Sequence, residues 1–142
     1  MAIAFHTQDS NFSLKQKTKH RQWISSCLEA KGFKAGELSL IFTSNTYLLS
    51  INREYLNHNY FTDVITFDYS EHEILVGDIF ISVDQVKLNA DDYTVSFEEE
   101  LRRVMIHGVL HLMGLNDATD IEKEEMRAGE NAALVLWESG IK

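Results

Sequence analysis

The segment 104–113 constrains this chain most, because it is apolar around the whole circumference of the helix that it would form. It reads Val-Met-Ile-His-Gly-Val-Leu-His-Leu-Met. A helix without a polar face is buried on all sides. Ser96 and Glu99 form a capping box that begins this helix, and Gly114 is placed to end it. The sequence therefore predicts a central helix over 96–113 that other elements surround.

The rest of the sequence supplies those surrounding elements. Apolar periodicity predicts further helices, and alternation or β-branched composition predicts strands. The expected helices are 14–31, a segment capped by Ser44 or Asn45, 84–92 and 119–139, and the expected strands are 37–43, 64–69 and 74–83. The intervening residues 70–73 are few enough for a hairpin turn. This order predicts an α+β fold, in which helices cover a small mixed sheet and the central helix is buried.

The chain is expected to form one domain over residues 1–142. Its glycines are scattered, it has no proline, and no linker or repeat interrupts it. The single cysteine, Cys27, excludes an internal disulfide framework and a multi-cysteine zinc site. No run approaches the roughly 20 apolar residues of a membrane span, and the first residues do not resemble a signal peptide. We therefore expect a cytoplasmic protein without a membrane partner.

Two histidines interrupt the apolar central helix. His107 and His111 are four residues apart, so both imidazoles lie on one face. Burying two polar rings costs free energy unless each finds a partner, and a metal ion would serve both. Two hydrogen-bonded core histidines are the alternative interpretation. The turn after the helix favours the metal, because it returns a third ligand, Asp117, towards the same place. Asp120 is a second candidate for that position.

This segment resembles the metal motif of the YbeY family, His-Gly-x-x-His-x-x-Gly-x-Asp-His. The chain has His-Gly-Val-Leu-His-Leu-Met-Gly-Leu-Asn-Asp at 107–117. Three other segments resemble family patterns in the same order: Ile-Asn-Arg-Glu-Tyr at 51–55, Thr-Asp-Val-Ile-Thr-Phe at 62–67 and Val-Gly-Asp-Ile-Phe-Ile-Ser at 76–82. Met126 and Glu130 fit a Met-x-x-x-Glu pattern. Each segment alone is a weak signal, but the set is specific.

The resemblance implies a metal-dependent, single-strand-specific endoribonuclease. The family acts in maturation of small-subunit (16S) ribosomal RNA and in ribosome quality control. The expected partners are thus single-stranded RNA and the small ribosomal subunit, and DNA is not expected. The expected cofactor is one zinc ion per chain, held by His107, His111 and Asp117. The catalytic group would be a water bound there or an attacking ribose 2′-OH, and no side chain is assigned as general acid or base.

Two residues depart from the family pattern. Asp117 stands where the third metal ligand is usually histidine, and its charge should make the ion a weaker Lewis acid. Leu56 stands where the family has an arginine associated with activity. Arg53, one helical turn earlier, is the candidate substrate-binding substitute. Both departures keep an alternative open, in which the chain is a ribosome-associated RNA-binding protein with a structural metal and weak or no nuclease activity.

The residue after the first histidine argues against a zinc protease. Proteases with a His-Glu-x-x-His helix use that glutamate as general base, and Gly108 stands in its place. Glycine costs a helix about 1 kcal/mol relative to alanine, so we expect Gly108 to admit another backbone or a substrate.

The charge balance restricts how RNA could bind. The chain has 13 Lys and Arg but 22 Asp and Glu, which gives a formal net charge of −9. A protein with this charge is not expected to bind nucleic acid through its overall charge. Local basic patches are therefore needed. The candidates are Lys15, Lys17, Lys19, His20 and Arg21 in one group and Arg53, Arg102 and Arg103 in another.

The remaining polar residues have expected places of their own. His6, His20 and His72 are expected at the surface, and His58 is a candidate helper in a loop. Asp63 is expected to be a structural hydrogen-bond partner. Glu130 is expected on a solvated acidic face of the last helix.

Overall fold

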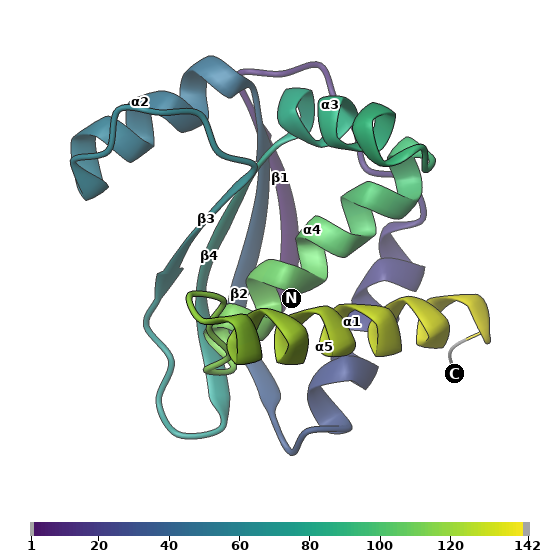
Figure 1. Cartoon of the computed structure of the whole chain (residues 1–142). Helices are drawn as coiled ribbons and strands as arrows, with labels where there is room; N and C mark the ends of the chain where they lie inside the picture. Colours follow the sequence, from purple (N-terminus) through teal and green to yellow (C-terminus); the bar gives the residue numbers. More distant parts are fainter. Residues whose placement is uncertain (1, 141–142) are drawn as a thin grey trace.

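The computed structural model describes residues 2–140 and has nine helices and strands within them. Their order along the chain is β1 (Ile3–Gln8), α1 (Lys17–Glu29), β2 (Lys34–Thr43), α2 (Asn45–Leu56), β3 (Val64–Asp68), β4 (Ile74–Ser82), α3 (Val83–Tyr93), α4 (Phe97–Leu112) and α5 (Asp120–Glu138). The predicted α+β class is confirmed (Figure 1). Every expected element forms, with ends that differ by a few residues.

The sheet has four strands in the order β1-β2-β4-β3. β1, β2 and β4 are parallel, and β3 runs antiparallel to β4, so the sheet is mixed as predicted. The turn over residues 70–73 joins β3 to β4, as the hairpin prediction requires. The first strand was not predicted. β1 lies at one edge of the sheet, and only its first residue, Ile3, is buried, so the strand lacks the apolar alternation that identifies the others.

Helix α4 lies across one face of the sheet, and α5 packs beside it (Figure 1). The main core fills the space between these layers and α1. The predicted burial of α4 is confirmed, since its apolar side chains from Leu101 to Leu112 are almost all inaccessible. Helix α2 covers the opposite face, where Leu48 and Ile51 pack against Ile65 of β3. The short β3 strand is therefore flanked by α2 on one face and α4 on the other.

Local signals explain where α4 and α5 begin. The Ser96 hydroxyl accepts a hydrogen bond from the Glu99 backbone N–H, as expected of a capping residue. Thr119 and Glu122 form a complete capping box at the start of α5. Within residues 2–140, no helix combines the length and the apolar character that crossing a bilayer demands.

Candidate metal centre

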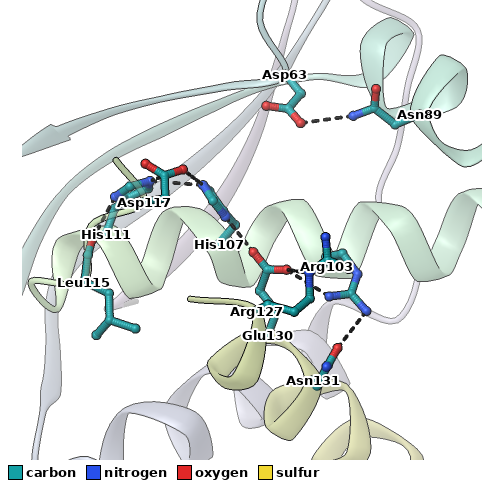
Figure 2. A network of polar contacts seen from close by, with 10 residues as sticks. All are labelled: Asp63, Asn89, Arg103, His107, His111, Leu115, Asp117, Arg127, Glu130 and Asn131. Atoms are coloured by element: carbon teal, nitrogen blue, oxygen red, sulfur yellow. Dashed lines mark hydrogen bonds and ion pairs between the residues drawn. The ribbon is translucent and has the colours of Figure 1, made fainter. Parts of the chain in front are cut away.

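The last two turns of α4 and the connection to α5 bring three potential ligands together. His107 and His111 lie one turn apart on the helix. Gly114 then adopts a positive φ of 102°, which reverses the chain without strain because glycine has no Cβ. The reversal returns Asp117 to the two imidazoles (Figure 2). The three side chains are the ones that the sequence predicted as a metal site.

The ligand atoms form a compact triangle. The Nε2 atoms of His107 and His111 are 3.0 Å apart. Asp117 Oδ2 lies 3.4 Å from the first and 3.7 Å from the second. All three atoms are within 4.8 Å of one another, a spacing that one divalent ion can bridge. Asp120, the other candidate for the third position, is not part of this group.

The hydrogen bonds on the far side of each ring show why a cation fits this triangle. His107 Nδ1 is 2.6 Å from Glu130 Oε2, and His111 Nδ1 is 2.9 Å from the carbonyl oxygen of Leu115. Both oxygens only accept, so each Nδ1 carries the proton and each neutral ring presents a lone pair at Nε2. Two lone pairs and a carboxylate oxygen thus converge on one point. The three electron-rich atoms repel one another unless a positive charge lies between them, so their arrangement favours a bound cation.

Helix α5 supports the site through Glu130. This carboxylate is buried, accepts from His107 with one oxygen and pairs with Arg103 through the other at 2.8 Å. A second Arg103 nitrogen donates to the Asn131 side chain at 3.0 Å. The network holds the His107 ring in one orientation, which is the usual task of a carboxylate behind a metal-binding histidine. The expectation that Glu130 lies on a solvated face is wrong, because Met126 and Glu130 share the inward side of α5.

The charges around the site favour a positive occupant. Burial lowers the pKa of His107, but the hydrogen bond and charge of Glu130, together with Asp117, outweigh it and raise that pKa overall. Burial and the neighbouring His107 lower the pKa of His111. Burial also raises the pKa of Glu130, yet its bonds to His107 and Arg103 leave it below the usual value. The carboxylates of Glu130 and Asp117 beside His107 thus supply negative charge that a metal cation could balance.

The triangle opens into a cleft of about 490 Å³. Its wall is built from the end of α2, the loop that follows α2, the first residues of β3 and the ligand-bearing end of α4. The cleft therefore wraps around the β3 edge from one face of the sheet to the other. The three side chains line this cleft, so an ion held by them would be open to a further ligand from the cleft, as in catalytic zinc sites.

A family model described as endoribonuclease YbeY matches residues 2–138. The chain belongs to the YbeY family. It is 44% identical over 136 residues to the endoribonuclease YbeY of Parabacteroides distasonis, covering 96% of each chain. It is 46% identical over 127 residues to that of Flavobacterium psychrophilum, covering 89% of this chain and 91% of the other.

A solved structure shows the same fold. The solution structure of TM1509 from Thermotoga maritima matches with a TM-score of 0.66 at 22% identity, covering 96% of this chain and 92% of that one. The resemblance inferred from the sequence motifs is thereby confirmed for the YbeY family and its fold.

The two departures from the YbeY pattern lie in different places. Asp117 is in the ligand triangle. Leu56 is in the cleft wall, where the family arginine would also stand, and its side chain is partly exposed. Arg53 is exposed outside the wall, and its Nε donates to the Asn59 side chain at 2.5 Å. Its role in substrate binding stays a prediction.

Two loop residues before β3 also face the YbeY cleft. His58 lies in the wall, as a helper would. Asp63 lines the same cleft as His107 and Asp117 and accepts a hydrogen bond from the Asn89 side-chain amide at 3.0 Å. Burial raises the pKa of Asp63. The expected structural hydrogen bond of Asp63 is present, and its place in the cleft was not predicted.

The basic groups do not lie as the sequence suggested. His20 is only 3% exposed and packs against Trp23 and Trp137, so its expected surface position is wrong. Arg102 lies over the Trp137 ring, and Arg103 is engaged with Glu130. The burial of His20 was detectable, because His20 extends the apolar stripe of α1 by one turn towards its start.

Proposed function

We propose that this chain is a zinc-dependent endoribonuclease that cleaves single-stranded RNA during maturation of 16S ribosomal RNA. Membership of the YbeY family supports RNA cleavage and favours it over the binding-protein alternative. The structural observation that carries the proposal is the convergence of two imidazole lone pairs and one carboxylate in the wall of an open cleft. A site that served stability alone would have no need of an opening towards solvent.

The donor set supports zinc. Two imidazole nitrogens and one carboxylate oxygen are common zinc ligands, and three protein ligands with a fourth position open are typical of catalytic zinc. When bound, such an ion lowers the pKa of coordinated water and neutralises charge that grows on a phosphate. Asp117 reduces the net positive charge at this point, which makes the site a milder electrophile than three histidines would.

The protein groups around the ion would orient it and its substrate. Glu130 and the Leu115 carbonyl hold the two imidazoles in the tautomer that presents Nε2 to the cleft. Asp63 and His58 lie in the same wall, within the space that a bound nucleotide would fill. Apart from the three ligands and Tyr60, they are the titratable side chains that line the cleft, and the proposal assigns the role of general acid or base to neither.

The shape of the cleft supports a single-stranded substrate. The triangle lies inside a cleft that bends around the edge of the sheet, and a strand must leave its partner to follow such a path. Paired RNA keeps its backbone in the helical form and cannot splay out in this way. A ribosomal RNA substrate would bring the enzyme to the small ribosomal subunit in the cytoplasm.

The decisive experiment measures metal content and RNA cleavage on the same preparations. Purified protein, His107→Ala and His111→Ala would be assayed for zinc by mass spectrometry and for cleavage of matched single-stranded and duplex RNA, before and after chelation. We expect about one zinc per wild-type chain, loss in both variants, and cleavage of the single strand only when zinc is present. Unchanged metal in both variants would remove the site, and zinc-loaded protein that binds RNA without cutting it would restore the binding-protein alternative.

A further inference from the structure

The active-site cleft lacks the cations that usually hold a nucleic-acid strand. Among the described residues that line it, none is Lys or Arg, whereas Asp63 and Asp117 are both carboxylates. The chain as a whole carries a net charge of −9. Within this cleft, protein contacts other than ion pairs must therefore contribute to holding the RNA. Arg103 and Arg127 line a neighbouring hollow that shares Asp63, His107 and Asp117 with the cleft, and both arginines pair with Glu130.

The cleft offers an aromatic pair for this purpose. Tyr60 and His58 both line it, and their rings are nearly parallel, with centroids 5.1 Å apart and planes 19° apart. A hydrogen bond of 3.0 Å joins the Tyr60 hydroxyl to His58 Nδ1. Tyr60 is nevertheless 56% exposed, so much of its ring remains free for another flat group. Bases stack on such rings whatever their identity.

The pair is held in place by one buried side chain. Asn52, only 2% exposed on α2, donates from its amide to the Tyr60 carbonyl oxygen at 2.9 Å. The backbone carbonyl of Asn52 also accepts from the His58 N–H at 3.0 Å. Asn57 ends α2 in the left-handed conformation, which starts the loop. Since both sides of the loop are bound to one residue of a helix, the aromatic pair is ordered before RNA arrives, and binding costs less entropy.

We propose that His58 and Tyr60 form a stacking platform for one base of the RNA strand whose phosphate lies at the metal triangle. The proposal rests on the proposed nuclease function and adds how the substrate is held. Leu56 lies in the same wall and is 39% exposed, so it extends the platform with apolar surface where the family arginine would place a charge. In this chain, base stacking thus replaces part of the usual phosphate contact.

Other exposed aromatic residues do not share this position. Tyr55 packs edge-on against Phe67 and does not line the cleft. Tyr69 is as exposed as Tyr60 but follows β3 and lines a separate surface hollow by the β3–β4 turn. Tyr69 therefore provides a matched control, because the same substitution there removes an equally exposed ring away from the cleft.

The test pairs a protein change with an RNA change. Zinc-loaded protein is titrated with an end-labelled 2′-O-methyl oligonucleotide of about eight nucleotides, and affinity is measured by fluorescence anisotropy. A gel run after each titration checks that the strand is intact. A second series replaces one base at a time with an abasic position. The proteins are wild type, Tyr60→Ala, Tyr60→Phe and Tyr69→Ala.

We expect Tyr60→Ala to weaken binding about 5- to 150-fold, the effect of one lost base stack. Tyr60→Phe keeps the ring and should stay within about threefold of wild type, as should Tyr69→Ala. In the wild type one abasic position should weaken binding by a similar factor, and in Tyr60→Ala the same position should have no further effect. That loss of additivity identifies the base that stacks.

The platform is refuted if Tyr60→Ala binds within twofold of wild type, or if every abasic position weakens both proteins equally. These outcomes are separate from the fate of the nuclease proposal. If the wild-type protein cuts RNA and Tyr60→Ala binds RNA as tightly as wild type, the nuclease proposal stands and the stacking platform is refuted. If the protein does not cut RNA, yet Tyr60→Ala and one abasic position weaken binding non-additively, the stacking platform stands and the nuclease proposal is refuted.

Discussion

Replacing Gly108 with alanine should destabilise this protein, although the same change stabilises most helices. A Cβ at Gly108 would lie 2.7 Å from Cγ2 of Ile79 and 3.4 Å from Cγ2 of Val64. Ile79 is fully buried on β4, between β2 and β3, so it has no room to withdraw. Gly108 therefore makes room for side chains of the sheet, Ile79 and Val64, whereas the sequence led us to expect another backbone or a substrate there.

Two opposing terms set the size of the effect. Alanine gains about 1 kcal/mol of helix propensity over glycine. Forcing a methyl group into a packed core costs about 1–3 kcal/mol. The difference predicts a free energy of unfolding that is lower by about 1 kcal/mol. Urea unfolding, followed by the fluorescence of the buried Trp23 and Trp137, measures it directly.

Gly129 provides the matched control within α5. Its new Cβ would meet Cδ1 of Leu110 at 3.0 Å, the far end of a flexible side chain that can rotate away. Gly129→Ala should therefore leave stability unchanged or raise it by up to about 1 kcal/mol. With Ile79→Ala as background, the obstacle is gone, and Gly108→Ala should become stabilising too. A Gly108→Ala protein that is as stable as Gly129→Ala would refute this account of the helix–sheet contact.

Three further predictions concern the metal site and its cleft, and a fourth concerns the buried His20. Asp117→Ala should lower zinc affinity by more than about 100-fold in a competition titration, whereas Asp117→His should retain binding; full affinity in the alanine variant would move the third ligand elsewhere. Glu130→Gln keeps the shape but removes the charge behind His107, so zinc affinity should fall about tenfold, and an unchanged affinity would deny Glu130 a supporting role. Burial lowers the pKa of His20 in the folded protein, so on acidification the His20 ring is protonated more readily in the unfolded chain than in the folded one. The free energy of unfolding should therefore fall as the pH drops below about 6.5, the ordinary pKa of histidine. Urea titrations at several pH values should show a smaller loss in His20→Leu than in wild type, and equal losses would contradict the assignment. Leu56→Arg adds a cation to the cleft wall, so RNA cleavage should rise and its dependence on salt should steepen by about one counterion; a rate and a salt slope that match wild type would place residue 56 away from the phosphates.

Much of the fold could be predicted because its signals are local. The capping residues, the apolar stripe of α4 and the glycine at 114 each act within a few residues, so the helices were found with small errors at their ends. β1 was missed for the opposite reason. Its pairing with β2 is parallel and joins residues about 35 apart, Ile3 with Leu38, and nothing in the six residues of β1 reveals that partner.

The site was predictable to the extent that its residues are neighbours in sequence. His107, His111 and Asp117 lie within one helix end and one turn, and their spacing and chemistry identified them. Arg103 and Glu130 are 27 residues apart, and only the packing of α5 on α4 joins them. Charge patterning predicted Glu130 in solvent because acidic residues surround it in sequence. Glu130 follows the inward-facing Met126 by about one helical turn, and this spacing, which the prediction did not use, agrees with its burial.

The edge of β3 forms a wall of this cleft whose main-chain groups amino-acid substitutions leave chemically unchanged. Val64, Ile65 and Thr66 all line the cleft, although alternate side chains point to opposite faces of the sheet, so the cleft meets the strand at its edge. In residues 2–140 no strand pairs with that edge. Its amide and carbonyl groups recur about every 6.6 Å, and no mutation of a side chain removes them. Substitutions can therefore reshape the opposite loop, while this wall keeps a main-chain pattern of donors and acceptors that is independent of sequence.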